Sequence, residues 1–198
     1  MRNKSIIQSL TREKEREVYR IAATLFNKHG YAATSIRQIC KTIGIRESSL
    51  YHYIQSKEDL LYLICKSAMT QSLEVVEPIS KSANLPESKL MKMIEAHIIT
   101  IADNVHEHST LLKELRSLGD EKQKDIIKLR DRYEMIFRKA VEEYMKESPA
   151  CKKNIKIVTL GLLGMMNWLI YWYSEGGEMK SDKISKVFWN LFAHGVCQ

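Results

Sequence analysis

The sequence predicts an all-α protein, and three observations support this fold class. The 198-residue chain contains only 8 glycines and 3 prolines, so it has long stretches without the residues that interrupt helices. Apolar residues recur three and four positions apart along these stretches, which is the spacing of one helix face. Hydrophobic residues make up 44% and charged residues 28%, a balance that excludes a disordered or collagen-like chain.

The N-terminal third contains the signals of four helices. Gly30 ends the first helix, and Ser35 caps the second, with Gln38 at the partner position of a capping box. Gly44 can take the left-handed backbone conformation that ends the second helix, and Ser56 caps the fourth. The predicted helices cover residues 11–29, 35–43, 46–53 and 56–77.

The rest of the chain contains four further helical patterns. Breaks at Pro86, at Gly119, at Pro149 and at the pair Gly176–Gly177 separate these patterns. The predicted helices cover residues 88–101, 121–147, 152–174 and 181–196. Helices therefore account for most of the chain.

Positive charge is concentrated near the N-terminus. The whole chain has a formal net charge of +7 and a pI near 9.1. Residues 1–68 contain 12 lysines and arginines against 6 aspartates and glutamates, whereas the remaining residues are nearly neutral. This asymmetry is typical of a nucleic-acid-binding end, although a basic solvated surface without a partner gives the same count.

The second and third predicted helices have helix-turn-helix spacing, because only a few residues around Gly44 separate them. Leu50 is the expected inward anchor of the third helix. The other residues of that helix are mainly short hydroxyls and aromatics, instead of the lysine–glutamate pairs of an ordinary surface helix. Short hydroxyls permit close approach to a DNA groove, and aromatic hydroxyls reach phosphates at its wall.

Residues 17–64 resemble the DNA-binding domain of the tetracycline-repressor (TetR) family of bacterial transcription regulators. The resemblance is carried, with its internal spacing intact, by Ala22, Leu25, Phe26, Gly30, Thr34–Cys40, Gly44–Ile45, Ser49–Ile54 and Ser56–Leu60. Cys40 stands where the family usually has alanine, and Ile54 where it often has phenylalanine. Both changes keep an apolar side chain.

This resemblance implies an all-α homodimer that binds a pseudo-palindromic operator in double-stranded DNA. It implies a helix-turn-helix DNA-binding domain at residues 1–56 and a ligand-binding and dimerisation domain at 57–198, linked by the helix at 56–77. The expected function is that of a repressor released from its operator by a small molecule.

The family's DNA-contacting positions can be carried over to this sequence. Tyr53 and Lys57 match positions that hold the phosphate backbone, and Ser35 matches a helix N-terminus that favours an anion. Arg37 matches a position facing base edges, where a guanidinium can bridge O6 and N7 of guanine. The expected DNA-binding residues are Ser35, Arg37, Arg46, Ser48, Ser49, Tyr51, His52, Tyr53 and Lys57.

In the family's architecture the last two helices pair with their copies in a four-helix bundle. The predicted helix at 152–174 is apolar on nearly all sides, so it must be buried against something. Gly161 and Gly164 permit close approach of another helix. The expected dimer interface contains Leu160, Leu163, Trp172, Phe188, Trp189 and Phe192.

The family also keeps a cavity for a small effector in this domain. The 9 methionines of the chain suit an adaptable pocket, although methionine at helical spacing is more often core. Residues 95–196 contain the pattern Leu112, Glu114–Leu115, Arg130–Tyr133 and Trp172–Gly177. With this pattern they resemble the ligand domain of acyl-CoA-responsive regulators of fatty-acid or sterol breakdown, which implies a hydrophobic effector such as an acyl-CoA. A lipophilic cation or drug is the alternative ligand. The expected pocket residues are Met69, Leu73, Met91, Ile94, Arg130, Tyr133, Phe137, Met165 and Trp168.

Other functions find less support in the sequence. The 4 cysteines are widely separated and lack zinc spacing, and His97 suits a core position, so we expect no metal or cofactor. No segment combines a nucleophile, a base and an orienting group, so we expect no enzyme. The uncharged run at 157–174 approaches the length of a membrane span, but a buried helix gives the same pattern. We expect a cytoplasmic protein without a membrane segment, and an architectural DNA-binding protein is the alternative function.

Overall fold

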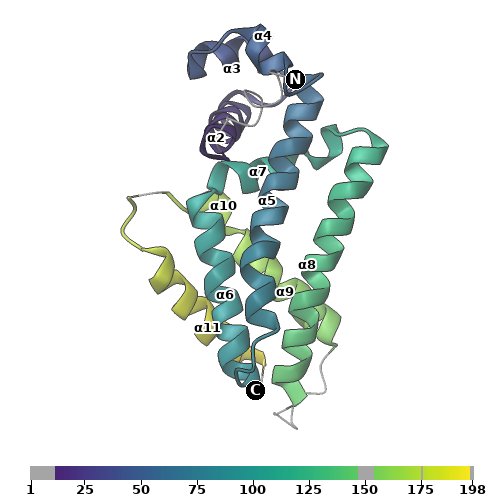
Figure 1. Cartoon of the computed structure of the whole chain (residues 1–198). Helices are drawn as coiled ribbons and strands as arrows, with labels where there is room; N and C mark the ends of the chain where they lie inside the picture. The colour runs from purple at the N-terminus through teal and green to yellow at the C-terminus, as the bar shows by residue number, and fades with distance from the viewer. Residues whose placement is uncertain (1–11, 147–153, 175, 197–198) are drawn as a thin grey trace. The chain divides into compact units, whose positions relative to one another are not determined.

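The computed structural model describes residues 12–146, 154–174 and 176–196 (Figure 1). Within these residues the chain forms helices and turns and no strand, which confirms the predicted all-α fold class. The contacts divide the chain into two compact units. The first unit falls within residues 1–67 and 106–123, and the second within residues 68–105 and 124–198.

The helix-turn-helix lies in the first unit. This unit contains α2 (Arg12–His29), α3 (Ile36–Ile43), α4 (Glu47–Tyr51) and the beginning of α5 (Lys57–Ser80). At the start of α3, Ser35 Oγ accepts a hydrogen bond from the backbone N–H of Gln38 at 3.1 Å. Gly44 ends α3 with φ of 81°, in the left-handed region where glycine is favoured. Both boundaries of this helix agree with the sequence.

The helix α4 is shorter than the predicted helix at 46–53. It ends at Tyr51, and the backbone N–H of Tyr53 bonds to the carbonyl of Leu50 at 2.9 Å. This hydrogen bond joins residues three positions apart, as in a 3₁₀ helix, and tightens the last turn. His52 and Tyr53 therefore follow the α-helix instead of extending it.

The first unit also contains a helix that the sequence did not predict. The helix α7 (Val105–Glu114) belongs to this unit from its second residue, His106, together with the short 3₁₀ helix η1 (Leu115–Ser117). Asn27 of α2 binds α7 through both ends of its side-chain amide. Its Nδ2 donates to the carbonyl of His106 at 2.9 Å and to Thr110 Oγ1 at 3.0 Å, and its Oδ1 accepts from Ser109 Oγ at 2.5 Å.

The contacts of the chain cross the expected domain boundary. The expected second domain contains all of residues 57–198, whereas residues 106–123 group with the N-terminal unit in the structure. A second set of bonds joins the start of α5 to the start of α8 (Asp120–Lys146). Glu58 Oε1 accepts from the backbone N–H of Gly119 at 3.2 Å, and Lys122 Nζ lies 2.5 Å from Asp59 Oδ1.

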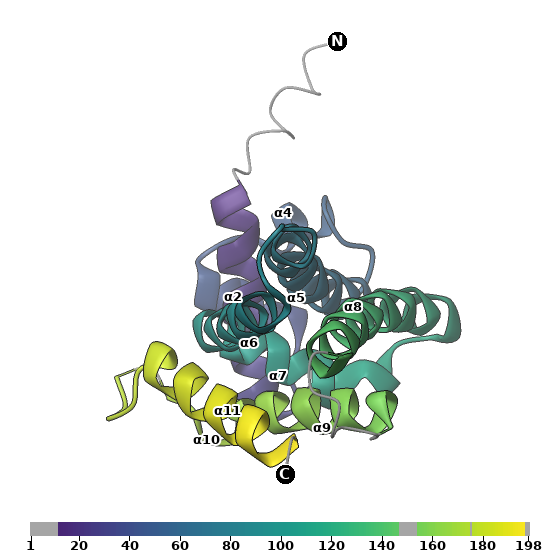
Figure 2. The same cartoon turned by 90° about the horizontal axis from the view of Figure 1, so that it is seen from below.

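The second unit contains the rest of α5 and α8, with α6 (Pro86–Asp103), α9 (Ile155–Asn167), α10 (Leu169–Trp172) and α11 (Ser181–Val196). In this unit α11 packs against α6 and lies beside α9 (Figure 2). The core is formed by fully buried aliphatic and aromatic side chains, among them Leu90, Ile94, Ile98, Ile126 and Phe137. Apolar periodicity on α6 and α8 accounts for this core.

The predicted helix at 152–174 is divided in the structure. Its residues 152 and 153 lie outside the described part, and the remainder forms α9 and α10 on either side of Trp168. The hydrogen bonds continue across this residue, because its N–H bonds to the carbonyl of Gly164 at 3.1 Å. The backbone N–H of Tyr171 then bonds to the carbonyl of Trp168, three positions earlier, as in a 3₁₀ helix. This bond tightens the turn and explains why α9 and α10 are separate helices.

Candidate functional site

The two helices of the helix-turn-helix are held by buried apolar anchors. Ile36 and Ile39 of α3 and Leu50 of α4 are buried, and Ile54 is buried just beyond α4. The residues between these anchors face outward. Every expected DNA-contacting residue from Arg37 to Tyr53 has an exposed side chain, namely Arg37, Arg46, Ser48, Ser49, Tyr51, His52 and Tyr53. The structure therefore brings these residues together on the outer side of one motif.

The charge at this outer side suits an anion. The first turn of α3 contains no acidic residue, so its backbone N–H groups and the positive end of the helix dipole are not neutralised by a carboxylate. Among the described residues, no ion pair engages the guanidinium groups of Arg37 and Arg46. Glu47 is the one acidic residue of α4. The motif therefore presents cations and hydrogen-bond donors with a single opposing charge.

Lys57 is placed differently from the other expected DNA-binding residues. Its side chain is half-buried, and Nζ donates to the carbonyls of Tyr31, Ala32 and Thr34 at 2.9, 3.2 and 3.0 Å. Nζ also lies 4.4 Å from the centre of the Tyr31 ring. An ammonium group has three donors, and here the protein's own carbonyls accept all three. The expected phosphate contact of Lys57 is therefore not prepared in this structure.

Part of the expected effector pocket forms a buried cluster between α6 and α8. Tyr133 and Phe137 of α8 contact His97 of α6, and His97 Nδ1 lies 2.8 Å from Tyr133 Oη. Burial raises the pKa of the Tyr133 hydroxyl, so this hydroxyl stays protonated. Ile94 is buried in the same unit. His97, expected only as a core residue, thus joins the expected pocket residues as their polar partner.

The other expected pocket residues are distributed over buried and exposed positions. Met69 and Leu73 of α5 are buried, and Met165 of α9 is half-buried. In contrast, Met91, Arg130 and Trp168 are exposed, Trp168 to 61%. The structure therefore does not bring these three side chains into the buried cluster.

The expected dimer residues also separate into two groups. Trp189 and Phe192 are buried, because both pack against the ring of Tyr144 within the same chain. In contrast, Leu160 and Trp172 are exposed, whereas Leu163 and Phe188 are half-buried.

The exposed apolar face on these helices includes residues that were not expected at the dimer interface. They are Ile157 on α9, Trp168 between α9 and α10, Tyr171 on α10, and Val187 and Leu191 on α11. A Cβ atom added at Gly161 or at Gly164 meets nothing within 4 Å, so both glycines lie at the open surface. The alternation of buried and exposed positions along α11 could have identified Leu191, but only once the inward side of the helix was known.

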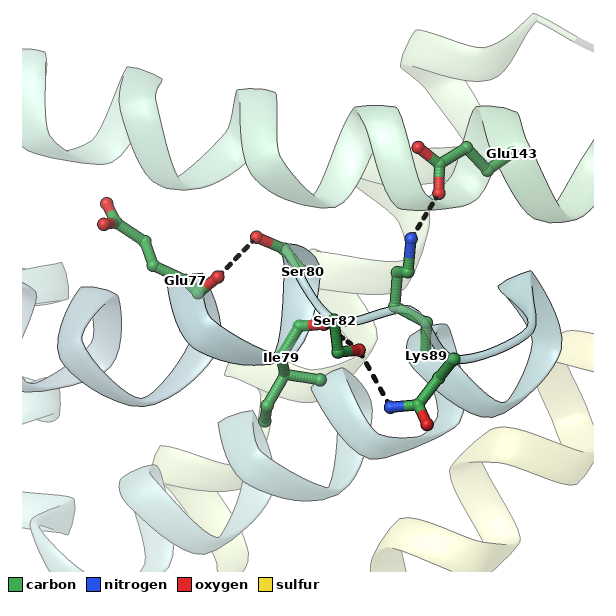
Figure 3. A network of polar contacts seen from close by, with 7 residues as sticks. Glu77, Ile79, Ser80, Ser82, Lys89 and Glu143 are labelled. Carbon is green, nitrogen blue, oxygen red and sulfur yellow. Dashed lines mark hydrogen bonds and ion pairs between the residues drawn. The ribbon is translucent and has the colours of Figure 1, made fainter.

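A polar network closes the corner between α5 and α6 (Figure 3). Ser80 Oγ donates to the carbonyl of Glu77 at 2.8 Å, and Ser82 donates to the preceding turn. Lys89 of α6 reaches Glu143 of α8 at 2.9 Å, and its side chain is only 12% exposed. This nearly buried cation is paired, so it joins α6 to α8 and does not offer a free charge to a ligand.

Two further features bear on the class of protein. The described residues contain no group of three or more histidine, cysteine, aspartate or glutamate side chains arranged to hold a metal ion. One helical stretch, Ile155–Trp172, is long and apolar enough to span a membrane by length and composition. It contains the exposed apolar face of α9 and α10.

Two family models match the chain. The model of bacterial regulatory proteins of the tetR family matches residues 19–62, which contain the helix-turn-helix. The model of tetracyclin repressor-like C-terminal domains matches residues 83–196, more than half of the chain. The matches cover both structural units.

Relatives and solved structures agree with these matches. The HTH-type transcriptional repressor KstR2 of Mycolicibacterium smegmatis is 24% identical over 190 residues, which cover 92% of this chain and 90% of the relative. The TetR family transcriptional regulator PfmR from Thermus thermophilus has a TM-score of 0.83 at 28% identity, covering 91% of this chain and 99% of that structure.

A second similar structure contains ligands. The crystal structure of AibR in complex with isovaleryl coenzyme A and operator DNA has a TM-score of 0.78 at 22% identity, covering 89% of this chain and 96% of that structure. This likeness shows a shared fold. The matched families and relatives regulate transcription and are not enzymes, which agrees with the expectation from sequence. The chain belongs to the TetR family of bacterial transcription regulators.

Proposed function

We propose that this protein represses transcription by binding operator DNA as a homodimer, and that a hydrophobic acyl-CoA releases it. The DNA-binding part of the proposal rests on the residues exposed on the outer side of α3 and α4. Seven polar, aromatic or cationic residues between Arg37 and Tyr53 are exposed above buried apolar anchors. Two of them, Tyr51 and Tyr53, are 49% and 42% exposed at the end of one short helix, where aromatic hydroxyls can reach phosphates.

In this proposal the exposed residues divide into two roles. Ser35 and the first amides of α3 bind a phosphate, as does the hydroxyl of Tyr53. Arg37 reads a guanine through O6 and N7, and Arg46 supplies a further cation. The short side chains of Ser48 and Ser49, with Tyr51 and His52, contact base edges or the groove wall. In this proposal the site binds the major groove of double-stranded DNA in the cytoplasm.

The homodimer is supported by the exposed apolar face of α9, α10 and α11. Five large side chains there, Ile157, Trp168, Tyr171, Trp172 and Leu191, are between 46% and 63% exposed. Large apolar side chains exposed together on neighbouring helices are typical of an interaction surface. A second copy would cover it and approach closely at Gly161 and Gly164, where a Cβ atom meets nothing. A homodimer would bury this apolar face against protein, so the apolar stretch Ile155–Trp172 would not have to lie in a membrane.

The acyl-CoA is supported by the chemistry of the second unit. Buried apolar side chains there surround a hydrogen-bonded pair of polar side chains, His97 and Tyr133, which suits an acyl chain with its carbonyl group. The exposed cations Lys128 and Arg130 on α8 suit the phosphates of coenzyme A. The likeness to AibR, whose crystal structure contains isovaleryl coenzyme A, supports the same ligand class.

Two helices provide the path from effector to DNA. Both α5 and α8 begin in the first unit and continue in the second. A ligand changes the operator affinity only through its different affinities for the two arrangements of these helices. A near-complete switch requires on the order of 5.5 kcal/mol of such a difference.

Calorimetry on the free protein and on the operator complex tests the proposal. The operator is first located by gel shift with the DNA upstream of the protein's own gene. Acyl-CoA thioesters of increasing chain length are then titrated into both forms. We expect tighter binding to the free protein, and operator DNA should weaken acyl-CoA binding by the factor by which acyl-CoA weakens operator binding.

The controls in this experiment separate the parts of the proposal. Coenzyme A without an acyl chain should bind weakly, since it has no apolar group to contact the apolar side chains of the second unit. Equal acyl-CoA affinities in the two titrations would refute the coupling between the two sites. If a lipophilic cation released the protein from its operator and no acyl-CoA did, the effector would be a lipophilic cation and not an acyl-CoA. Operator binding unaffected by any small molecule would favour an architectural DNA-binding protein.

A further inference from the structure

The first residue of α5 closes a clip around the connection between α2 and α3. Lys57 Nζ donates to the carbonyls of Tyr31, Ala32 and Thr34, and it lies over the Tyr31 ring. The three carbonyls belong to a segment between two helices, where backbone acceptors lack helical partners. One ammonium group therefore satisfies three main-chain oxygens at once.

The segment held by this clip is anchored to the core on its other side. The Tyr31 ring packs edge-on against Phe26 with the centroids 5.1 Å apart, and Phe26 is buried. Thr34 is buried as well, and its Oγ1 donates to the carbonyl of Gly30 at 2.8 Å. Lys57 thus completes the set of contacts that fixes the backbone from residue 30 to residue 34.

This backbone leads directly into α3. Ser35, the cap of α3, follows Thr34, so the bond from Lys57 to the Thr34 carbonyl holds the peptide group that immediately precedes the cap. We propose that Lys57 is a positioning residue, which orients the N-terminus of α3 for a phosphate and does not contact a phosphate itself. This inference rests on the proposed operator binding.

Phosphate contact and positioning make different predictions for the salt dependence of operator binding. A lysine that contacts a phosphate displaces counterions, so its removal makes the slope of log affinity against log salt shallower by about 0.9. A lysine whose three donors stay with carbonyls displaces no counterion at the contact. Its removal lowers the affinity and leaves the slope unchanged.

The first experiment compares Lys57→Met with a matched control, Lys28→Met. Lys28 is exposed in the last turn of α2, so its loss removes the same charge from the same unit. We expect Lys57→Met to weaken operator binding at least about tenfold, the equivalent of ~1.4 kcal/mol, at every salt concentration. Its slope should equal that of Lys28→Met. A shallower slope by about 0.9, or unchanged affinity, would overturn the inference.

Amide hydrogen exchange on the free variants separates positioning from a general loss of stability. In Lys57→Met the amides of residues 36–38 should exchange faster, while those in the middle of α2 should exchange as in the unaltered protein. Faster exchange throughout the first unit would show that Lys57 only stabilises the fold, and would count against the inference.

Nuclear magnetic resonance of the unaltered protein gives a test that needs no variant. The ¹⁵N signal of the Lys57 ammonium should keep its position when operator DNA is added and should show no scalar coupling to ³¹P. A resolved coupling to a phosphate would overturn the inference. If the unaltered protein binds no operator, the proposed function fails, and the exchange measurement still decides what Lys57 does.

Discussion

The indole of Trp189 packs edge-on against the ring of Tyr144, with the ring centroids 5.5 Å apart and the planes at 66°. Trp189 lies on α11 and is 8% exposed, whereas Tyr144 lies on α8. Phe192 adds a second contact to the same ring at 6.2 Å. This aromatic cluster attaches the last helix to its own chain, so the side of α11 that is available to a partner is the opposite one, with Val187 and Leu191.

Substitutions on the two sides of α11 should therefore have different effects. Trp189→Ala should lower the free energy of unfolding by about 3–5 kcal/mol, because it removes a buried aromatic ring. Leu191→Glu should leave the monomer folded and break the homodimer, since it places a carboxylate in the proposed apolar contact. Urea unfolding and sedimentation velocity measure the two effects.

Leu85→Glu is the matched control for Leu191→Glu, because it makes the same substitution at another exposed leucine. Leu85 lies between α5 and α6, away from α11 in sequence, and is 74% exposed. This variant should sediment as a dimer like the unaltered protein. A well-folded monomer formed by the unaltered protein at micromolar concentration would contradict the proposed homodimer.

The N-terminal motif could be predicted closely because its signals are local. The cap at Ser35, the glycine at Gly44 and the anchor at Leu50 each act within one turn of the chain. Long-range hydrogen bonds have no such signature. Lys57 lies in a motif that is typical of a phosphate contact, but the three carbonyls that its ammonium group binds lie 23 to 26 positions earlier in the chain.

The helix α7 could not be predicted for a different reason. Its buried side chains include Glu107, His108, Ser109 and Thr110, so the inward face has no apolar periodicity. The two sides of α11 were also ambiguous, because apolar residues occur on both. Which of Trp189 and Leu191 turns inward depends on Tyr144, and that contact appears only in the folded chain.

Asn27 should be important for the stability of the first unit. Its side chain joins α2 to α7 through three hydrogen bonds across about 80 residues of sequence. Asn27→Ala should lower the free energy of unfolding by about 1–3 kcal/mol, because the polar groups of α7 that bond to the Asn27 amide would lose these hydrogen bonds. Asn84→Ala is the control, because Asn84 is exposed and its side chain donates to the neighbouring Ser82. A loss no larger than that of the control, measured by urea unfolding, would show that α7 does not depend on Asn27.

His108 should make the stability of the protein depend on pH. Burial lowers the pKa of this imidazole to about 4, from 6.5. Between these pH values the unfolded chain binds a proton that the folded chain does not, so the free energy of unfolding falls as the pH drops from 6.5 to 4. The full loss from this group is roughly 3 kcal/mol. Burial raises the pKa of neighbouring Glu107, which acts in the opposite direction.

The comparison of variants isolates the histidine from Glu107. In His108→Gln the decline in stability between pH 6.5 and pH 4 should be smaller than in the unaltered protein by this amount. His29→Gln, at an exposed position in the last turn of α2, should keep the original decline. Urea unfolding at several pH values measures the three curves, and parallel curves for His108→Gln and the unaltered protein would refute the prediction.

Arg37 should determine base preference at one position of each operator half-site. Its side chain is exposed on α3, and no ion pair among the described residues holds it, so the guanidinium can reach O6 and N7 of a guanine. Arg37→Ala should cost ~1–3 kcal/mol of operator binding and relax the preference at that base pair. Binding to a set of operators that vary one base pair at a time gives both quantities. Lys28→Ala should change neither, and a uniform loss across all operators for Arg37→Ala would identify Arg37 as a phosphate contact instead.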